Sequence, residues 1–430
     1  MIKDANYLRE VREHYENYPY PFRDPKDEET KLIQTHLSNF EAINHYCYRG
    51  KQTFENFDVL VAGCGTGDDV IFCAEFFKNM PSSRVVALDM TEASLNVAKE
   101  RAKVRGLTNI TWIHNSLMEL PNMDIGKFDY INCSGVLHHL EDPDAGLLAL
   151  KSVLKDDGFI GLMLYAEHGR TGVYKMQELL RRIHENEEDL QVKVDNTKLL
   201  LNNLPRTNWF VHTAQIFKVD MIDYGDIGIY DLLLHSQDRA YTVPQVYDYV
   251  ENAGLNFVSF IDPHNKKNYR TQSVVQDPKI RAIVEKLPLR KQQAICELLV
   301  GNVIKQTFFA SMKSNTVADL SDLTYIPYFA KRNQSVAIDI ANAIESLKPE
   351  HTAVRYKDAS AEMNLIPTKN SAAIIKHIDN TRTLKEIFEK ANSELKGKLS
   401  EDKFKAEFKE IFEQFETFNI MFLRASKETK

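Results

Sequence analysis

A short apolar run that ends in a glycine-rich turn constrains this chain more than any other feature. The run from Val59 to Ala62 predicts a buried strand of a parallel sheet. The turn Gly63-x-Gly65-x-Gly67 follows, and the apolar spacing of a helix begins at Val70. Glycine permits positive φ and lets a ligand approach the backbone above the start of a helix. The stretch therefore predicts the strand, turn and helix that open a nucleotide-binding βαβ unit.

Acidic residues near this turn restrict the kind of nucleotide. A dinucleotide fingerprint requires a glycine or alanine directly after Gly67, where this chain has Asp68 followed by Asp69. Two carboxylates suit the start of a helix but would repel a pyrophosphate, which disfavours an NAD-dependent enzyme. They are compatible with a positively charged ligand without phosphate, such as S-adenosylmethionine. A second predicted strand starts at Arg84 and ends in Asp89, which we expect to bind ribose hydroxyls.

From about residue 15 to residue 164, the order of motifs resembles that of class I S-adenosylmethionine-dependent methyltransferases. The segment from Asn115 to Pro121 resembles the adenine-binding turn, and Phe128 to Leu140 resembles the fourth strand and the loop after it. The resemblance implies S-adenosylmethionine as cofactor, S-adenosylhomocysteine as product, and no metal. It assigns cofactor contacts to Gly63, Cys64, Gly65, Gly67, Asp68, Asp89, Met90, Ser116, Leu117 and Ser134.

Two positions depart from the pattern of that family. The family often has an acidic residue two places before the first glycine, in contact with the ammonium group of methionine, and this chain has Val61. The family often has aspartate in the adenine turn, and this chain has Ser116, whose hydroxyl can still bond the adenine amino group. The cofactor prediction stands, with the contacts to its amino-acid end left open.

Composition excludes several other classes of protein. The chain has 430 residues, a net charge of −7 and 43% hydrophobic residues, which predicts a soluble protein of two or three domains and no nucleic-acid partner. No apolar run approaches the ~20 residues that a membrane span requires, and the first residues do not resemble a signal peptide. The five cysteines are scattered, which argues against disulfides and a zinc site. We therefore expect a cytoplasmic protein without a membrane partner.

The order of predicted elements defines three regions. Residues 1–50 form an N-terminal helical cap, residues 51–315 the methyltransferase domain, and residues 316–430 an accessory domain. Alternating strands and helices predict an α/β, doubly wound, Rossmann-like sheet, and the resemblance implies seven strands, the last antiparallel. The polar, largely helical residues 166–240 form an insertion that leaves the sheet on its ligand side. We expect this insertion to cover the substrate.

The C-terminal region predicts a small α+β domain. Helices are expected at Ser371–Ile378, Leu384–Ala391 and Glu401–Phe418, with a short strand at Ile420–Leu423. This order resembles a winged-helix module, which some bacterial protein-lysine methyltransferases carry at the C-terminus. Acidic and basic residues are about equal in number there, which disfavours DNA binding. Protein contact or a homodimer through this domain is the prediction for its partner.

The candidate catalytic residues follow the fourth and fifth strands. His138 and His139 could take a proton from a hydroxyl or an amine, with His138 preferred, or one of them could cap the loop. Tyr165 could orient an amine or pack locally. Candidate substrate-binding residues are Tyr18, Tyr20, Glu167, Arg170, Arg239 and Tyr241. Tyr18 and Tyr20 could form a lid over the ligand or could only pack locally. Glu167 and Arg170 could bind the substrate or could form an ion pair that stabilises the insertion.

These observations predict a methyltransferase that moves a methyl group from S-adenosylmethionine to an N or O nucleophile. The accessory domain and the large insertion favour a protein side chain as the acceptor, and a small metabolite remains the alternative. A second class of function is a non-catalytic protein that senses the cofactor or binds a partner. The departure at Val61 keeps that class open, whereas Asp89 and the histidine pair argue for an enzyme.

Overall fold

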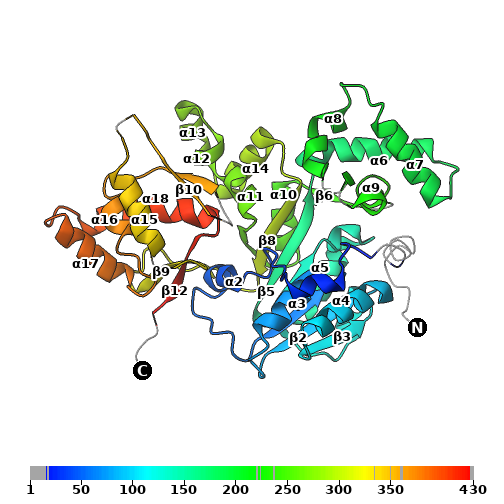
Figure 1. The fold of residues 1–430 in the computed structure, drawn as a ribbon, viewed down its shortest axis with the longest axis horizontal. Helices are drawn as coiled ribbons and strands as arrows, with labels where there is room; N and C mark the ends of the chain where they lie inside the picture. Colours follow the sequence, from blue (N-terminus) through cyan, green and yellow to red (C-terminus); the bar gives the residue numbers. More distant parts are fainter. Residues whose placement is uncertain are drawn as a thin grey trace. The chain divides into compact units, whose positions relative to one another are not determined.

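The computed structural model describes residues 16, 19–218, 221–222, 224–235, 238–333, 335–348, 350–358 and 362–426. Their contacts divide the chain into two compact units (Figure 1). Unit 1 combines the chain up to residue 38 with residues 54–260 and 268–313, and unit 2 combines residues 39–53, 261–267 and 314–430. Residues 39–53 thus belong with the C-terminal part of the chain. The predicted domain limits at residues 50 and 315 stay predictions.

Unit 1 is built on one mixed sheet with the strand order β3-β2-β1-β4-β5-β8-β7. Strands β1 to β5 pair in parallel, and β8 is antiparallel to both β5 and β7. This arrangement confirms the predicted Rossmann-like methyltransferase sheet with its antiparallel last strand. A short strand, β6, pairs with the end of β5. The bounds are β1 (Asp58–Ala62), β2 (Arg84–Asp89), β3 (Ile110–His114), β4 (Phe128–Ser134), β5 (Leu154–Ala166), β6 (Ala240–Tyr241), β7 (Asn256–Phe260) and β8 (Lys305–Ser311).

Helices cover both faces of this sheet because alternate side chains of each strand point to opposite faces. Leu60 of β1 packs in one cluster with Leu147 of α5 (Pro143–Ser152) and Val246 of α10 (Val243–Asn252). Helices α3 (Asp68–Phe76) and α4 (Glu92–Val104) contact β1 and β2. Strand order reverses at β1, so right-handed crossovers place α3 and α4 on the face opposite α5. This reversal leaves a crevice outside the carboxyl ends of the strands, where ligands of such folds bind.

The local sequence accounts for several helix ends. Helix α5 ends at Ser152, and Leu154 already begins β5. Residues 278–300 form two helices, α13 (Pro278–Val284) and α14 (Leu289–Val300). Pro288 lies between them and serves as the N-cap of α14, since proline cannot continue a preceding helix. The short helix α12 (Thr271–Val274) precedes both.

The insertion after β5 is helical, as predicted. It contains α6 (Thr171–Ile183), α7 (Leu190–Leu201), α8 (Trp209–Thr213) and α9 (Gly225–Leu233). Val173 and Met176 of α6 pack with Phe210 of α8 and Leu232 of α9 in a small apolar core. This core is separate from the cluster that holds β1, α5 and α10 together. The insertion therefore has a small apolar core of its own, and Ile304 from just before β8 also packs against it.

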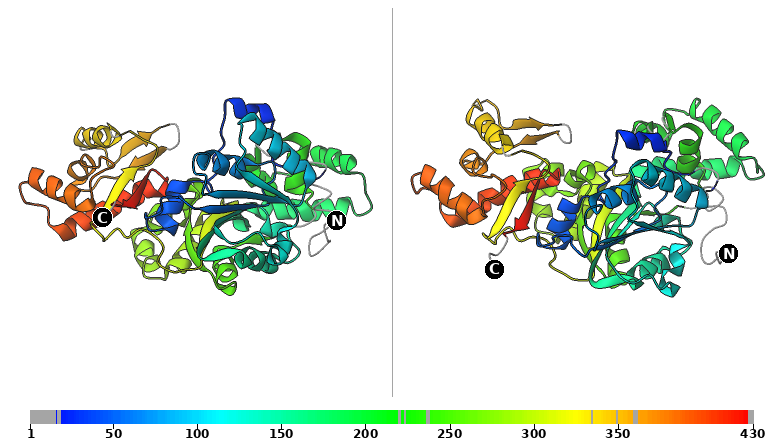
Figure 2. Two further views of the ribbon diagram at one scale, coloured as in Figure 1. Left: turned by 90° about the horizontal axis from the view of Figure 1, so that it is seen from below. Right: turned by 60° about the horizontal axis from the view of Figure 1, so that its bottom comes forward.

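Unit 2 contains the three C-terminal helices and the final strand at the predicted places. Strand β12 pairs antiparallel with β9, and the two lie side by side in Figure 2. The hairpin of β10 and β11 precedes α16. The winged-helix identity of this region stays a prediction. The bounds are α2 (Phe40–Cys47), α11 (Pro263–Lys266), β9 (Tyr325–Phe329), α15 (Ser335–Glu345), β10 (Val354–Lys357), β11 (Glu362–Leu365), α16 (Ser371–Ile375), α17 (Leu384–Glu394), α18 (Glu401–Thr417) and β12 (Met421–Ala425).

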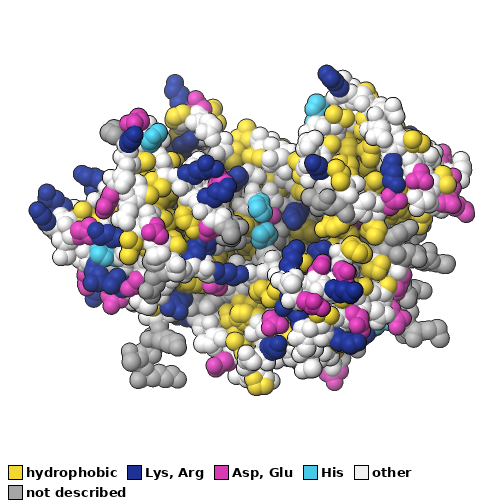
Figure 3. Space-filling view, viewed as in Figure 1, with side chains coloured by type: hydrophobic (Ala, Val, Ile, Leu, Met, Phe, Trp, Pro, Cys, Tyr) yellow, Lys and Arg dark blue, Asp and Glu magenta, His cyan; other side chains and the backbone are white. Residues whose placement is uncertain are grey.

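Helix α2 packs within unit 2 against β12. The buried His45 ring accepts a hydrogen bond at its Nδ1 from the Leu423 backbone N–H at 3.2 Å. Burial lowers the pKa of His45 to about 3, which keeps the ring neutral. Among the described helices, none has both the length and the apolar content to cross a membrane. On the face drawn in Figure 3, acidic and basic side chains are interspersed.

Candidate functional site

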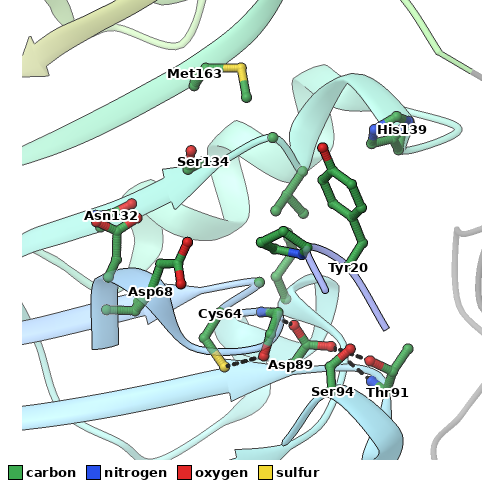
Figure 4. A pocket seen from close by; sticks show the side chains of 18 of the residues that line it. Tyr20, Cys64, Asp68, Asp89, Thr91, Ser94, Asn132, Ser134, His139 and Met163 are labelled. Carbon is green, nitrogen blue, oxygen red and sulfur yellow. Dashed lines mark hydrogen bonds between the residues drawn. The ribbon is translucent and has the colours of Figure 1, made fainter. Parts of the chain in front are cut away.

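A cavity of about 400 Å³ lies in unit 1 at the carboxyl ends of β1, β2, β4 and β5 (Figure 4). Its size falls within the range of small-molecule sites. It lies where the strand order of the sheet reverses, which is where ligands of such folds bind. Of the predicted site residues, the cavity is lined by Tyr20, Gly63, Cys64, Gly65, Asp68, Asp89, Met90, Ser116, Leu117, Ser134, His139, Tyr165 and Arg170.

The glycine turn forms the floor of this cavity, and its conformation requires glycine. Gly63 and Gly65 have φ values of 72° and 50°. A Cβ on Gly63 would lie 2.3 Å from the Val136 side chain, and one on Gly65 would lie 2.8 Å from the Tyr20 carbonyl oxygen. Gly67 does not line the cavity. A Cβ there would lie 2.9 Å from Ala98, so Gly67 permits the close packing of α3 on α4.

Asp89 lies at the end of β2 and joins that strand to the glycine turn. Its Oδ2 accepts a hydrogen bond from the Gly65 N–H at 2.7 Å, and its Oδ1 accepts hydrogen bonds from the Thr91 N–H and hydroxyl at 2.9 and 2.8 Å. Burial raises the pKa of Asp89, while these hydrogen bonds oppose the shift. A carboxylate oxygen accepts more than one hydrogen bond. Asp89 therefore fits the ribose hydroxyls of an adenosyl ligand without losing its structural contacts.

The predicted adenine turn lies beside Asp89. Ser116 is the N-cap of a short 3₁₀ helix, Leu117–Asn122, and its hydroxyl oxygen accepts a hydrogen bond from the Met118 N–H at 3.2 Å. The hydroxyl proton of Ser116 is not used in that bond, so it can donate to a ligand. Cys64 also lines the cavity, and burial raises the pKa of its thiol well above the ordinary value. A neutral thiol of this kind packs against a ligand and is a poor nucleophile.

The N-terminal segment passes over the glycine turn. Thr66 Oγ1 donates a hydrogen bond to the Pro21 carbonyl at 2.7 Å. The Arg23 guanidinium donates two hydrogen bonds to the Asp68 carboxylate, at 2.8 and 2.6 Å. Tyr20 lines the cavity, whereas Phe22 is largely exposed. These contacts agree with a covering role for Tyr20; Tyr18, the other predicted lid residue, lies outside the described residues.

The ion pairs of Asp68 change the interpretation of the two acidic residues, Asp68 and Asp69, that follow the glycine turn. Arg101 also contacts Asp68, at 2.8 Å. Although burial opposes the shift, the hydrogen bonds and charges of Arg23 and Arg101 hold the pKa of Asp68 below its usual range. Two arginines therefore neutralise this carboxylate from within the protein. A positively charged ligand finds less negative charge at Asp68 than the sequence suggested.

Aromatic and charged side chains line the other end of the cavity. The His139 ring stacks on the His235 ring, with centroids 4.2 Å apart, and meets the Tyr165 ring edge-on at 5.6 Å. The Arg170 guanidinium lies 3.6 Å from the centre of the Tyr165 ring, a cation–π contact that fixes the ring. Asp238 pairs with Arg170 at 3.5 Å. Histidine and tyrosine thus converge beside the region that the glycine turn and Asp89 define.

His138, the preferred base at the level of sequence, does not line the cavity. Its side chain is fully buried, and its ring lies 4.0 Å from the Tyr165 ring and 4.2 Å from the His139 ring. Burial lowers the pKa of His138 far below its usual value, and neither ring nitrogen has a hydrogen-bond partner among the described residues. The geometry favours His139 over His138 as the histidine that can reach a ligand. A catalytic role for either one stays a prediction.

Three predicted substrate residues do not line the cavity. Glu167 is exposed at the end of β5, and its backbone N–H bonds to the Tyr241 carbonyl. Tyr241 is buried against Tyr249, with ring centroids 5.3 Å apart. The Arg239 guanidinium lies 5.1 Å from the Tyr241 ring. These contacts give Arg239 and Tyr241 a packing role, and their contact with a substrate stays a prediction.

Several cavity residues were missed by the sequence predictions. Asn132 is a polar residue within the apolar strand β4, a signal that could have identified it. Asp69 was noticed in the turn but not assigned to the site. Thr35, Phe217 and Lys305 come from distant segments with no local motif. Tertiary structure alone brings these last three to the cavity.

Comparisons with known proteins agree with this geometry. A family model described as a methyltransferase domain matches residues 54–240. The uncharacterized protein syc1184_c of Synechococcus sp. is 34% identical over 206 residues, which cover 47% of this chain and 48% of that protein. Demethylmenaquinone methyltransferase of Geobacillus stearothermophilus is 36% identical over 95 residues, which cover 22% of this chain and 39% of that protein. The chain spans less than half the length of either curated relative.

A solved structure resembles the chain over most of its length. PKMT2 from Rickettsia typhi, in complex with AdoHcy, has a TM-score of 0.63 at 16% identity, over 92% of this chain and 77% of that chain. At this level of identity the likeness shows a shared fold. Together with the family match and the sheet order, it shows that residues 54–240 resemble a methyltransferase domain in sequence and in fold.

Proposed function

We propose that this chain transfers a methyl group from S-adenosylmethionine to an N or O nucleophile on a protein side chain. The product of the cofactor is S-adenosylhomocysteine. One observation carries the proposal: a single cavity in unit 1 joins the glycine turn and Asp89 to His139 and Tyr165. An adenosyl ligand held at Asp89 shares this cavity with groups that can position and deprotonate an acceptor.

S-adenosylmethionine brings an already activated methyl group, so the protein mainly has to align the acceptor and exclude water. On the cofactor side, Asp89 accepts ribose hydroxyls, and the backbone at Gly63 and Gly65 allows close approach. Ser116 and Leu117 lie where the adenine ring fits. These residues line one cavity and depend on backbone positions that tolerate no side chain at the glycines.

The proposed acceptor side has a proton acceptor and a positioning group. His139 lines the cavity and is the group that can take a proton from a hydroxyl or a protonated amine. Tyr165, held by the Arg170 guanidinium, orients the acceptor. Asp231 also lines this part of the cavity and adds negative charge. An acceptor with a positively charged form, such as an amine, is therefore favoured.

The preference for a protein acceptor rests on the rest of the chain. The likeness to PKMT2 covers 92% of this chain, which includes the insertion and the C-terminal unit. The helical insertion supplies Phe217, Asp231 and Leu232 to the cavity wall. In this proposal the C-terminal unit, with its winged-helix-like order of helices, binds the protein acceptor or a second copy of the chain.

A transfer assay tests the proposal. Purified protein is incubated with tritiated S-adenosylmethionine and either a protein fraction or a small-molecule fraction of a cell lysate. The proposal predicts label in the protein fraction that depends on His139 and is absent with an Asp89→Ala variant. Label confined to the small-molecule fraction would replace the protein acceptor by a metabolite. No label in either fraction would contradict the enzymatic proposal and favour a cofactor-binding protein.

A further inference from the structure

The histidine that lines the cavity is in contact with two other histidine rings. His139 is the last residue of the short 3₁₀ helix after β4, and Figure 4 shows its ring at the end of the pocket away from Asn132. The His138 ring lies against it at an angle of 53°, and the His235 ring stacks on it at an angle of 27°, both with centroids 4.2 Å apart. Because protein interiors are closely packed, rings at these distances leave the His139 imidazole little space to rotate.

The two neighbouring rings come from different parts of the fold. His138 belongs to the same 3₁₀ helix as His139. His235 belongs to the insertion and lies two residues after the end of α9. Its side chain is buried, and it does not line the cavity. The contact of His235 with the cavity is therefore indirect and goes through the ring of His139.

Hydrogen bonds hold this part of the insertion in place. The Arg239 backbone N–H donates to the His138 carbonyl at 3.0 Å, which joins the end of the insertion to the 3₁₀ helix. The Asp238 carboxylate accepts a hydrogen bond from Gln177 Nε2 of α6 at 3.2 Å, which joins the same segment to the rest of the insertion. The position of His235 is thus set by the insertion and by the 3₁₀ helix together.

The orientation of His139 matters for the proposed reaction. A general base has to place one ring nitrogen within hydrogen-bond reach of the proton that it takes. The two nitrogens of an imidazole are not equivalent, so a rotated ring presents the wrong atom or the wrong direction. A ring that is already held in one rotamer also loses less conformational entropy when the acceptor binds. A neighbour that fixes this ring therefore contributes to the rate.

We propose that His235 is a positioning residue for methyl transfer, an inference that rests on the proposed function. In the transfer step, the acceptor atom forms a bond to the methyl carbon, and the electrons of the broken carbon–sulfur bond stay on the sulfur of S-adenosylhomocysteine. The proton that the acceptor loses goes to a ring nitrogen of His139. His235 takes part in none of these bonds and holds the His139 ring in the orientation that receives the proton. The insertion thereby contributes to catalysis as well as to the cavity wall.

Three substitutions at one position test this assignment. His235→Ala removes the stacked ring, His235→Leu keeps a side chain of some size without a ring, and His235→Phe keeps a flat ring. The rate of label transfer from tritiated S-adenosylmethionine to the protein fraction of a lysate is expected to fall about tenfold to a hundredfold in His235→Ala and His235→Leu. In His235→Phe it should stay within about threefold of the wild type, because the stacked ring is kept.

Binding of the cofactor product separates positioning from a general structural role. The affinity for S-adenosylhomocysteine, measured by calorimetric titration, should be unchanged in all three variants, since His235 does not line the cavity. His184→Ala is the matched control, because His184 is another buried histidine of the insertion and does not line the cavity either. It should leave both the rate and the affinity unchanged. If His235→Ala does not fold, His235→Leu and His235→Phe decide the question.

A double-mutant cycle tests whether His235 acts through His139. In the His139→Gln background, His235→Ala should cause no further loss of rate, because the ring that it positions is absent. Additive losses, an equal loss of affinity for S-adenosylhomocysteine, or a His235→Phe variant as slow as His235→Ala would overturn the inference and leave the proposed function intact. A wild-type rate in His139→Gln would overturn it as well. A wild-type protein without any transfer would overturn the proposed function and this inference together.

Discussion

The two ends of the cavity are built in different ways. The cofactor end comes from the continuous segment from β1 to the turn after β3, in which Asp89 accepts hydrogen bonds from Gly65 and Thr91. The acceptor end combines segments that are far apart in the chain, among them His139, Phe217 and Lys305. A local motif can specify the first end, whereas only the complete fold of unit 1 can assemble the second. Substitutions at the two ends should therefore have different consequences.

The largest effect is expected at the glycine turn. Gly63→Ala combines positive φ with a Cβ that would overlap Val136, and it should lower the free energy of unfolding by about 3 kcal/mol and abolish binding of S-adenosylhomocysteine. Gly106→Ala is the matched control, since Gly106 also has positive φ but open space around it. It should cost about 1 kcal/mol, with binding unchanged. Equal losses in chemical denaturation would contradict the steric explanation.

At the acceptor end, catalysis should be lost without loss of cofactor binding. His139→Gln is expected to reduce the rate of methyl transfer about a hundredfold, the usual contribution of a positioned acid or base. Its affinity for S-adenosylhomocysteine should equal that of the wild type, because His139 lies away from Asp89. The control is His212→Gln on the exposed surface of the insertion. A parallel loss of binding and rate in His139→Gln would show that the two ends are not separable.

Asp69, which lines the cavity, should make cofactor binding depend on pH. Burial raises the pKa of Asp69 to about 6; hydrogen bonds from Thr35, Ser38 and Asn132 oppose this shift, and the charge of Asp68 adds to it. Asp69 is ionised above that pH and neutral below it, so binding of an ammonium should weaken as the pH falls. Between pH 7.5 and pH 5 the affinity for S-adenosylhomocysteine should drop about tenfold more in the wild type than in Asp69→Asn. Identical pH profiles in calorimetry would exclude this role for Asp69.

The smallest effect is expected for the N-terminal segment. Arg23→Gln removes one of the two arginines that pair with Asp68, and Arg101 still holds that carboxylate. The free energy of unfolding should fall by about 1 kcal/mol or less. If the segment covers the cofactor, S-adenosylhomocysteine should also dissociate faster, by about threefold, measured in stopped-flow displacement. An unchanged dissociation rate would mean that the segment only packs against the glycine turn.

The parts of the site that could be predicted from the sequence depend on local backbone geometry. The glycine turn, Asp89 and the adenine turn follow predicted strands directly, and all three lie at the cavity. The doubly wound, Rossmann-like sheet of unit 1 and its antiparallel last strand were also predicted correctly. In each case a short stretch contains both the element and the residue that it positions.

The parts that could not be predicted depend on partners distant in sequence. Asp68 pairs with Arg23 and Arg101, which are 45 and 33 residues away, and no local pattern reveals that its charge is already neutralised. The difference between His138 and His139 depends on which ring faces the cavity in a 3₁₀ turn, Leu137–His139. The place of α2 in unit 2 depends on its contact with β12, at the far end of the chain.

Calorimetric titration with S-adenosylhomocysteine and NADH tests the central claim, that this cavity is built for an adenosyl ligand held by Asp89. We predict micromolar binding of S-adenosylhomocysteine to the wild type and to the exposed control Asp124→Ala, and no binding of NADH. In Asp89→Ala the affinity should fall about a hundredfold, because the acceptor for the ribose hydroxyls and the tie to Gly65 are both removed. Unchanged affinity in Asp89→Ala, or tighter binding of NADH, would contradict the account.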